Sequence, residues 1–230
     1  MVTVYPAPTL WQPDWPRCHR IIPSRFPAID LFERVIDSAL FDALYELESM
    51  TNDRLREEAG DIAMVDPDDR VFGSGATVVM AAFTHIGRAS RFTDGTYGVY
   101  YAANSTETAI RETVFSRQRF LASTNEPAIE IDMRMYVGNV ERPMHDIRSA
   151  DYVALHHPDD YSGSQMFSNG LKSEKSWGIV YNSVRHEGGE CIAALRPPAV
   201  GLPTPSKHFT YVWNGSRVTE WYEKKAGTLL

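Results

Sequence analysis

A glutamate in the middle of the chain has the setting that points most clearly to chemistry. Glu112 lies on a segment with helical periodicity, and its near neighbours are apolar: Ala109, Ile110, Val114 and Phe115. A partly buried carboxylate is costly unless it has a partner, so Glu112 is a candidate functional residue. Such a group can stabilise positive charge that develops in a transition state. The alternative is a helix-surface glutamate beside Arg111, which periodicity alone favours.

An arginine and a serine stand on either side of Glu112 in chain order. Arg91 lies in a polar loop over residues 84–97, and Ser183 ends an apolar segment over residues 176–183. An arginine fork binds phosphate or carboxylate oxygens through parallel hydrogen bonds, and a serine hydroxyl both donates and accepts. Taken singly, Arg91 is a loop cation and Ser183 a strand-end hydroxyl. In order with Glu112 they form a candidate set.

Other kinds of site find little support in the sequence. Gly73-Ser74-Gly75 lacks the third glycine of a dinucleotide fingerprint and the lysine of a phosphate loop, which favours a turn before an apolar segment. His156-His157 has no metal-ligand spacing, so we expect a loop with solvated histidines. The two cysteines, Cys18 and Cys191, cannot make a cysteine-only zinc site. We therefore expect no metal.

Composition limits the class of protein. The chain has 230 residues, of which 43% are hydrophobic, and a formal net charge of -7. The apolar share is typical of a globular protein, and the acidic balance argues against a general nucleic-acid binder. No apolar run approaches the ~18 residues that cross a bilayer, and the N-terminus does not resemble a secretory signal. We expect a cytoplasmic protein that binds neither membranes nor nucleic acid directly.

The elements that must position these residues are predicted from periodicity and turn signals. Helices dominate early and strands late without a regular βαβ alternation, which predicts a single α+β domain and not a doubly wound sheet. The proline- and aromatic-rich residues 1–17 predict an arm that lies over a domain formed by residues 18–230, with a helical insertion at about 28–70. The individual expectations are a helix over 30–50, a buried strand over 98–103, a helix capped by Asn104 that runs to about 121, an alternating strand over 129–136, a short helix over 160–171, strands over 176–183 and 190–195, and a hairpin around Asn214-Gly215.

Three stretches resemble a known family. They are SRFTDGTYGVYYAA from Ser90 to Ala103, ETAIRE from Glu107 to Glu112, and GIVYNSVR from Gly178 to Arg185. Their order and spacing are similar to the central block of the RES-domain family, which is named for an arginine, a glutamate and a serine. These match Arg91, Glu112 and Ser183 here, and an arginine that opens the domain matches Arg20. The resemblance runs from about Arg20 to about Pro198.

The resemblance implies a fold similar to ADP-ribosyltransferases, with a split, mixed β-sheet core and flanking helices. It also implies a bacterial toxin that consumes NAD+ and inhibits growth. The partner it implies is a small antitoxin with a helix-turn-helix domain of the Xre type; a homodimer is left open. NAD+ is then the substrate, and no metal is needed. The chain departs from the family pattern in its long interval between Arg20 and Arg91, in Arg91-Phe92-Thr93 where an Arg-Trp-Asn type is common, and at Cys191, where an asparagine is often found.

The chemistry of NAD+ cleavage suits these residue types. Breaking the nicotinamide–ribose bond passes through an oxocarbenium-like centre, which a carboxylate such as Glu112 stabilises. Arg20 and Arg91 suit the pyrophosphate. Tyr100 or Tyr101 can form an aromatic wall, and Ser183 can orient the nicotinamide ribose.

The acceptor of the ADP-ribose is predicted from one departure. Arginine-directed ADP-ribosyltransferases usually carry a second glutamate two positions before the catalytic one, and Ile110 stands there. Water or phosphate is therefore favoured as acceptor, which makes the chain an NAD+ hydrolase or phosphorylase. A protein mono-ADP-ribosyltransferase with the same NAD+ site, and a catalytically inactive module that binds a partner, are the alternatives.

Overall fold

The computed structural model describes residues 5–24, 60–225 and 227. The predicted helix over 30–50, and most of the predicted insertion at 28–70, lie outside the described residues. The described strands are β1 (Leu10–Trp11), β2 (Cys18–Pro23), β3 (Tyr100–Ala103), β4 (Ile129–Gly138), β5 (Met144–Asp146), β6 (Gly178–Asn182), β7 (Glu190–Ala194), β8 (Thr204–Trp213) and β9 (Val218–Lys224). The described helices are α3 (Ala76–Thr84), α4 (Thr106–Ser123) and α5 (Ser162–Ser173), with 3-10 turns η1 (Ile62–Met64), η2 (Pro67–Asp69), η3 (Ala150–His156) and η4 (Pro197–Ala199).

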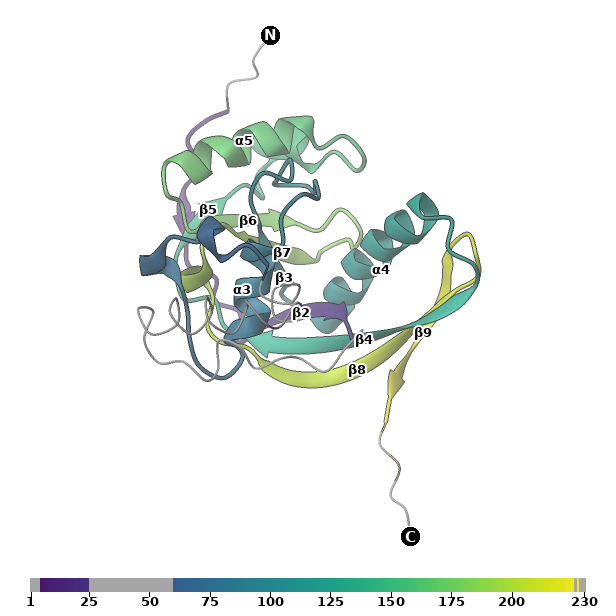
Figure 1. The fold of residues 1–230 in the computed structure, drawn as a ribbon. Coiled ribbons are helices and arrows are strands. Elements are labelled where there is room, and N and C mark those ends of the chain that lie inside the picture. Colours follow the sequence, from purple (N-terminus) through teal and green to yellow (C-terminus); the bar gives the residue numbers. More distant parts are fainter. Residues whose placement is uncertain (1–4, 25–59, 226, 228–230) are drawn as a thin grey trace.

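The strands form one mixed sheet in the order β1-β5-β6-β7-β3-β2-β4-β8-β9. β5 and β6 are parallel, and the other described neighbours are antiparallel. At the centre, β2 and β3 pair through a single register position, His19 opposite Ala103. The sheet is thus two halves joined by a narrow hinge, and Figure 1 shows α4 beside the point where they part. The predicted α+β class with a split, mixed sheet is confirmed.

α4 carries the candidate glutamate, and its start is fixed by Ser105. The Ser105 Oγ accepts from the backbone N–H of Thr108 at 3.2 Å, as an N-cap does. The predicted cap, Asn104, is therefore wrong by one residue. Asn104 Oδ1 accepts instead from the Thr108 hydroxyl at 3.3 Å and from the N–H of Glu190 at 3.3 Å, so it ties the helix start to β7.

α3 is a buried helix whose start needs glycine. Gly75 caps it with φ +90°, and a Cβ there would lie 2.3 Å from the carbonyl oxygen of Pro203. The predicted turn at Gly73-Ser74-Gly75 is confirmed. Gly98, at the entry to β3, lets the backbone pass close to α3, since a Cβ would lie 2.2 Å from the carbonyl of Ala82. α3 therefore packs closely on the face of β3 that carries Tyr100.

The described part of the N-terminal arm, from Tyr5, lies on the body. Residues of β1 pair with β5, and Tyr5 stacks on Tyr152 with ring centroids 6.1 Å apart. The Trp15 indole N–H donates to Glu190 at 2.9 Å. The arm thus contacts several elements of the sheet's first half.

Candidate functional site

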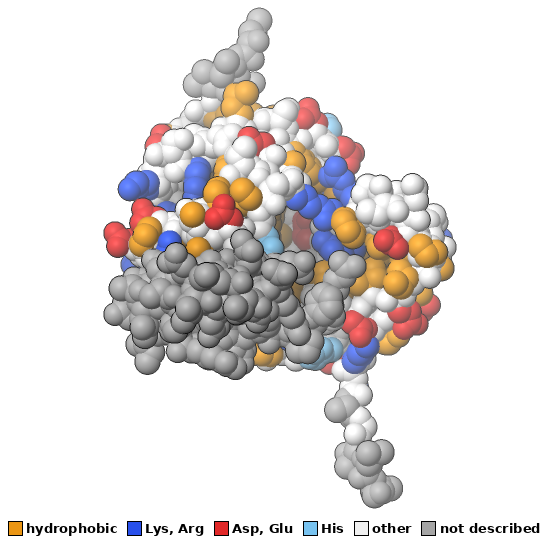
Figure 2. Space-filling model, in the orientation of Figure 1, with side chains coloured by type: hydrophobic (Ala, Val, Ile, Leu, Met, Phe, Trp, Pro, Cys, Tyr) orange, Lys and Arg blue, Asp and Glu red, His pale blue; other side chains and the backbone are white. Residues whose placement is uncertain are grey.

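A cleft of about 570 Å³ opens where the two halves of the sheet part. One wall is a face of α4, and another is the loop before β3. In Figure 2 blue side chains gather around a hollow in the surface beside α4. The lining residues used below are Arg20, Arg88, Arg91, Tyr101, Glu112, Phe115, Arg117, Arg119, Tyr161, Tyr181 and Cys191.

The charge of this cleft is opposite to that of the whole chain. Its described lining contains five arginines and one carboxylate, Glu112, whereas the chain has a net charge of -7. Clefts lined by one sign of charge concentrate ligands of the other sign. The cleft therefore suits an anionic ligand, with one negative group held at a defined place.

Ser183 holds that negative group. Its hydroxyl donates to Glu112 Oε1 at 2.6 Å. The Ser183 Oγ also accepts from the backbone N–H groups of Arg185 at 3.2 Å and His186 at 3.0 Å. Because these two donors occupy the lone pairs of the hydroxyl, its proton is directed to the carboxylate. Ser183 thus fixes the orientation of Glu112 from behind the cleft.

The loop that carries Ser183 is pressed against the first turn of α4. His186 Nδ1 lies 2.9 Å from the Thr108 hydroxyl, and a Cβ at Gly189 would lie 2.7 Å from the same oxygen. Arg185 lies over the Phe115 ring, with its Cζ 3.3 Å from the centroid. The carboxylate and its serine partner therefore belong to two elements that are joined at several points.

Arg91 is fixed by backbone carbonyls. It is 8% exposed, and its Nη1 donates to the carbonyls of Leu155 at 3.3 Å and His157 at 2.9 Å. Its Cζ lies 4.7 Å from the centroid of the Tyr161 ring. Ser164, on α5, donates to the Arg91 carbonyl at 2.6 Å. The guanidinium is thus oriented before any ligand binds, and carbonyl partners leave its charge uncompensated.

Tyr101 fastens the loop that carries Arg91. Its hydroxyl accepts from the N–H of Phe92 at 3.0 Å and forms a hydrogen bond of 2.7 Å with the Ser90 hydroxyl. Burial raises the pKa of Tyr101 to about 12, so the phenol is protonated at neutral pH. Its place in the lining makes Tyr101 an aromatic wall of the cleft.

Arg20 and Tyr100 belong together. The Arg20 Nη1 donates to the carbonyl of Tyr101 at 3.0 Å, and its Cζ lies 4.4 Å over the Tyr100 ring. Desolvation lowers the pKa of Arg20, and the buried Nε has no hydrogen-bond partner. Successive strand residues face opposite ways, so Tyr100 lies against α3 while Tyr101 faces the cleft. Tyr100 supports Arg20 and does not line the cleft.

Two further residues form the floor beside Glu112. Tyr181 and Cys191 are almost fully buried and sit on β6 and β7. Burial raises the pKa of both groups, and the Glu112 charge raises it further. Both are therefore neutral at physiological pH. Neither residue was predicted as part of the site. Their strands were recognisable, but no local signal showed that the two side chains lie beside Glu112.

Among the predicted residues, the structure brings Arg20, Arg91, Tyr101 and Glu112 to one cleft and joins Ser183 to Glu112. Sequence reasoning missed Tyr161, for which no signal exists. It also missed Arg119, which helical periodicity could have found, since it stands seven residues after Glu112.

Of the histidine pair, His157 is an exposed loop residue as predicted, but the prediction is wrong for His156. His156 is not a solvated loop residue: it ends η3, its Nδ1 lies 3.1 Å from the carbonyl of Tyr152, and its Nε2 accepts from the N–H of Asn182 at 3.2 Å. In the described part of the chain, no group of three or more His, Cys, Asp or Glu side chains is placed to hold a metal ion. Nor is any helix of those residues long and apolar enough to cross a bilayer.

Comparison with known proteins finds similarity to a family, to a curated protein and to a solved structure. The family described as the RES domain matches residues 68–214. An uncharacterized protein of Sinorhizobium fredii, y4oC, is 31% identical over 206 residues, which cover 89% of this chain and 86% of that protein. The crystal structure of the MbcT–MbcA toxin–antitoxin complex of M. tuberculosis contains a chain with a TM-score of 0.46 and 12% identity, over 91% of this chain and 88% of that one.

Proposed function

Because the chain belongs to the RES-domain family, we propose that it is a toxin enzyme that cleaves NAD+ at the nicotinamide–ribose bond. The observation that carries the proposal is the contact between Ser183 and Glu112, which places one oriented carboxylate in a cleft lined by arginines. That pattern of charge matches NAD+, whose pyrophosphate is anionic and whose reacting ribose becomes cationic.

Glu112 is the catalytic residue in this proposal. As the bond to nicotinamide breaks, positive charge grows on the ribose, and the carboxylate stabilises it. Stabilisation that exists mainly in the transition state raises the rate instead of only tightening binding. Ser183 acts through Glu112 as a positioning residue, because its hydroxyl is already engaged with the carboxylate and the loop backbone.

Arg20 and Arg91 bind the pyrophosphate. Each is held in place by protein carbonyls or aromatic rings, so little side-chain order is lost when the ligand binds. Tyr101 packs against the nicotinamide or its ribose. No metal or covalent nucleophile is needed, since the step is dissociation helped by position and charge.

Water or phosphate is the acceptor we favour. Ile110 is buried on α4 and is not among the residues that line the cleft, so a second glutamate is absent from the site. Transfer to a protein would use the same NAD+ site, and a catalytically inactive module would bind without releasing nicotinamide. We further propose that the enzyme acts in the cytoplasm and is inhibited by a small helix-turn-helix antitoxin of the Xre type. That partner would supply the DNA contact, in keeping with the acidic balance of this chain.

Product analysis tests the proposal. The full chain is incubated with NAD+, with and without phosphate, and the products are separated by chromatography. Free nicotinamide together with ADP-ribose or its phosphorylated form is the expected result. Labelled ADP-ribose on protein would favour the transferase, and no nicotinamide under any condition would favour the inactive module.

A further inference from the structure

The cleft contains more positive charge than the pyrophosphate of NAD+ requires. Glu112, Ser116, Arg119 and Ser123 all line it, and their spacing puts them on one face of α4. At 1.5 Å per residue, Arg119 lies about 10 Å along the helix axis from Glu112. The cleft therefore continues along α4, away from the catalytic carboxylate.

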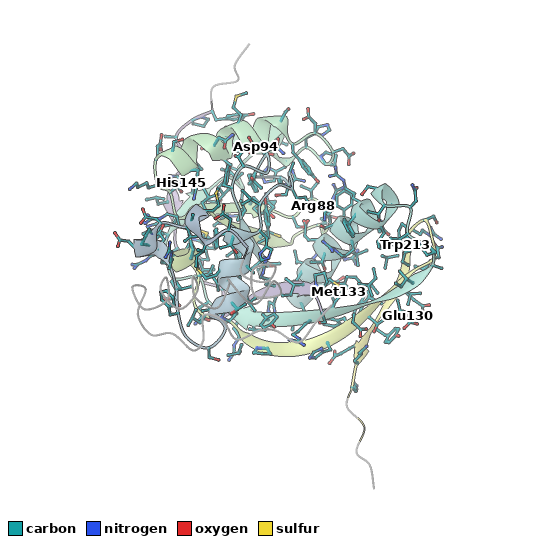
Figure 3. The ribbon with its side chains drawn as sticks, viewed as in Figure 1. Arg88, Asp94, Glu130, Met133, His145 and Trp213 are labelled. Atoms are coloured by element: carbon teal, nitrogen blue, oxygen red, sulfur yellow. The ribbon has the colours of Figure 1, made fainter. Side chains whose placement is uncertain are left out.

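Arg88 and Arg119 mark this outer end. The Arg119 Cζ lies 5.3 Å from the Tyr161 ring, the same ring that Arg91 approaches, and 5.8 Å from the Phe115 ring. The Arg88 Cζ lies 4.7 Å from the Phe120 ring, and Figure 3 shows Arg88 beside α4. Both guanidinium groups are thus held against aromatic faces.

Aromatic faces orient a guanidinium without cancelling its charge. The ion pairs within the described residues involve other side chains, and none includes Arg88 or Arg119. Arg111, which does not line the cleft, shows the contrast: it donates to Glu107 at 2.7 Å. The outer arginines therefore keep their charge available to a ligand.

A dinucleotide with its reacting ribose at Glu112 extends its pyrophosphate and then its second ribose along the cleft. Arg20 and Arg91 match the pyrophosphate, which has one charge on each phosphate. With Arg20 and Arg91 assigned to the two phosphates, Arg88 and Arg119 are left for a further anionic group in the same cleft, and the second ribose of NAD+ offers only hydroxyl groups. A phosphate on the second ribose would meet them, and arginine forks are the preferred partners of such a group.

We propose that Arg88 and Arg119 form a subsite for a ribose 2′-phosphate, so that the enzyme prefers NADP+ to NAD+. The inference rests on the proposed function. The same carbon–nitrogen bond breaks, and with water as acceptor the products are nicotinamide, 2′-phospho-ADP-ribose and a proton. The subsite determines specificity and takes no part in the bond-breaking step.

The test measures kcat/KM for NADP+ and NAD+ with the full chain. Wild-type protein is expected to favour NADP+ by roughly 10-fold or more, as hydrogen bonds to a charged group provide. In Arg119→Gln and Arg88→Gln, the ratio of the two kcat/KM values should fall toward one, mainly through KM for NADP+. Arg111→Gln, on the same helix, is the matched control and should leave the ratio unchanged. An unchanged ratio in both cleft variants would overturn the subsite.

A binding measurement separates this inference from the proposed function. Adenosine 2′,5′-bisphosphate and adenosine 5′-monophosphate are titrated into the protein by calorimetry, with no cleavage required. Tighter binding of the bisphosphate that is lost in Arg119→Gln supports the subsite, even if neither dinucleotide is cleaved and the proposed function fails. Equal binding of the two nucleotides to the wild-type protein would overturn it.

Discussion

At Glu112, charge and shape can be separated by one substitution. Glu112→Gln keeps the size of the side chain and removes the charge that, in the proposed mechanism, stabilises the cationic ribose. We expect nicotinamide release to fall by roughly 100- to 1,000-fold, the range for loss of one preorganised electrostatic partner. Glu107→Gln, on the exposed first turn of α4, is the control. A variant Glu112→Gln with near-parental activity and an unchanged melting curve would refute the catalytic role.

Ser183 offers a test of positioning, since it touches Glu112 and the loop backbone but not the cleft. Ser183→Ala should lower kcat by roughly 10- to 100-fold with little change in KM, because a hydrogen bond to a charged group is lost. Ser183→Thr retains a hydroxyl and should recover part of the rate. A large rise in KM at constant kcat would instead show that Ser183 contacts the substrate.

The residue types of the site could be predicted from the sequence, but which side chains face the cleft could not. Tyr100 and Tyr101 were equal candidates, and only the register of β3 against β7 and the burial beneath α3 decide that Tyr101 faces the cleft. The partnership of Ser183 with Glu112 spans 71 positions and has no local signal. The resemblance to a family identified these residues, but their contacts are determined by how the strands pair in the sheet.

At the scale of elements, the start of α4 links stability to the site. Ser105→Ala removes the N-cap and should lower the free energy of unfolding by about 1 kcal/mol. Because the Ser105 hydroxyl also lies 2.8 Å from the hydroxyl of Thr108, which contacts His186, we expect a several-fold loss of activity as well. Ser105→Asp can still cap the helix and should keep the stability. Urea unfolding monitored by circular dichroism measures the stability of both variants, and equal stability of Ser105→Ala and Ser105→Asp would contradict the role of Ser105 as the N-cap.

Elements with local signals were predicted well. The hairpin is confirmed: Asn214 Oδ1 accepts from the N–H groups of Ser216 and Arg217, both at 2.9 Å, and Gly215 adopts φ +95°. The strands predicted over 176–183 and 190–195 are confirmed as β6 and β7, and the structure pairs them antiparallel. α3 was recognised only as an apolar segment, because it is buried nearly all round and shows no polar stripe. The order of strands, and the single β2–β3 pair that opens the cleft, depend on distant segments and leave no trace in a short window.

At the scale of the whole molecule, three histidines make stability depend on pH. Burial lowers the pKa of His19, His145 and His156, so the folded state holds them neutral. Below about pH 6.5 the unfolded chain binds more protons than the folded one, and stability falls as pH decreases. Urea unfolding at pH 7.5, 6.5 and 5.5 should show this loss. In the parent, protonation of His156 would break its hydrogen bond from the Asn182 N–H. His156→Gln removes this titrating ring and should therefore reduce the dependence of the free energy of unfolding on pH. An unchanged dependence would show that this histidine does not contribute.

Under the proposed function, regulation is a property of the whole molecule as well, because an enzyme that drains NAD+ must be inhibited in its own cell. The chain is acidic overall, yet its cleft is lined by five arginines, so the cleft is the surface best suited to a partner's carboxylates or C-terminus. We therefore predict that the antitoxin covers the cleft and competes directly with NAD+. Calorimetric titration of NAD+ into Glu112→Gln protein, alone and saturated with antitoxin, measures the competition without turnover. Steric occlusion predicts that NAD+ binding disappears in the complex and that added salt weakens the antitoxin's binding. Unchanged NAD+ affinity at saturating antitoxin would show that inhibition acts from a distance.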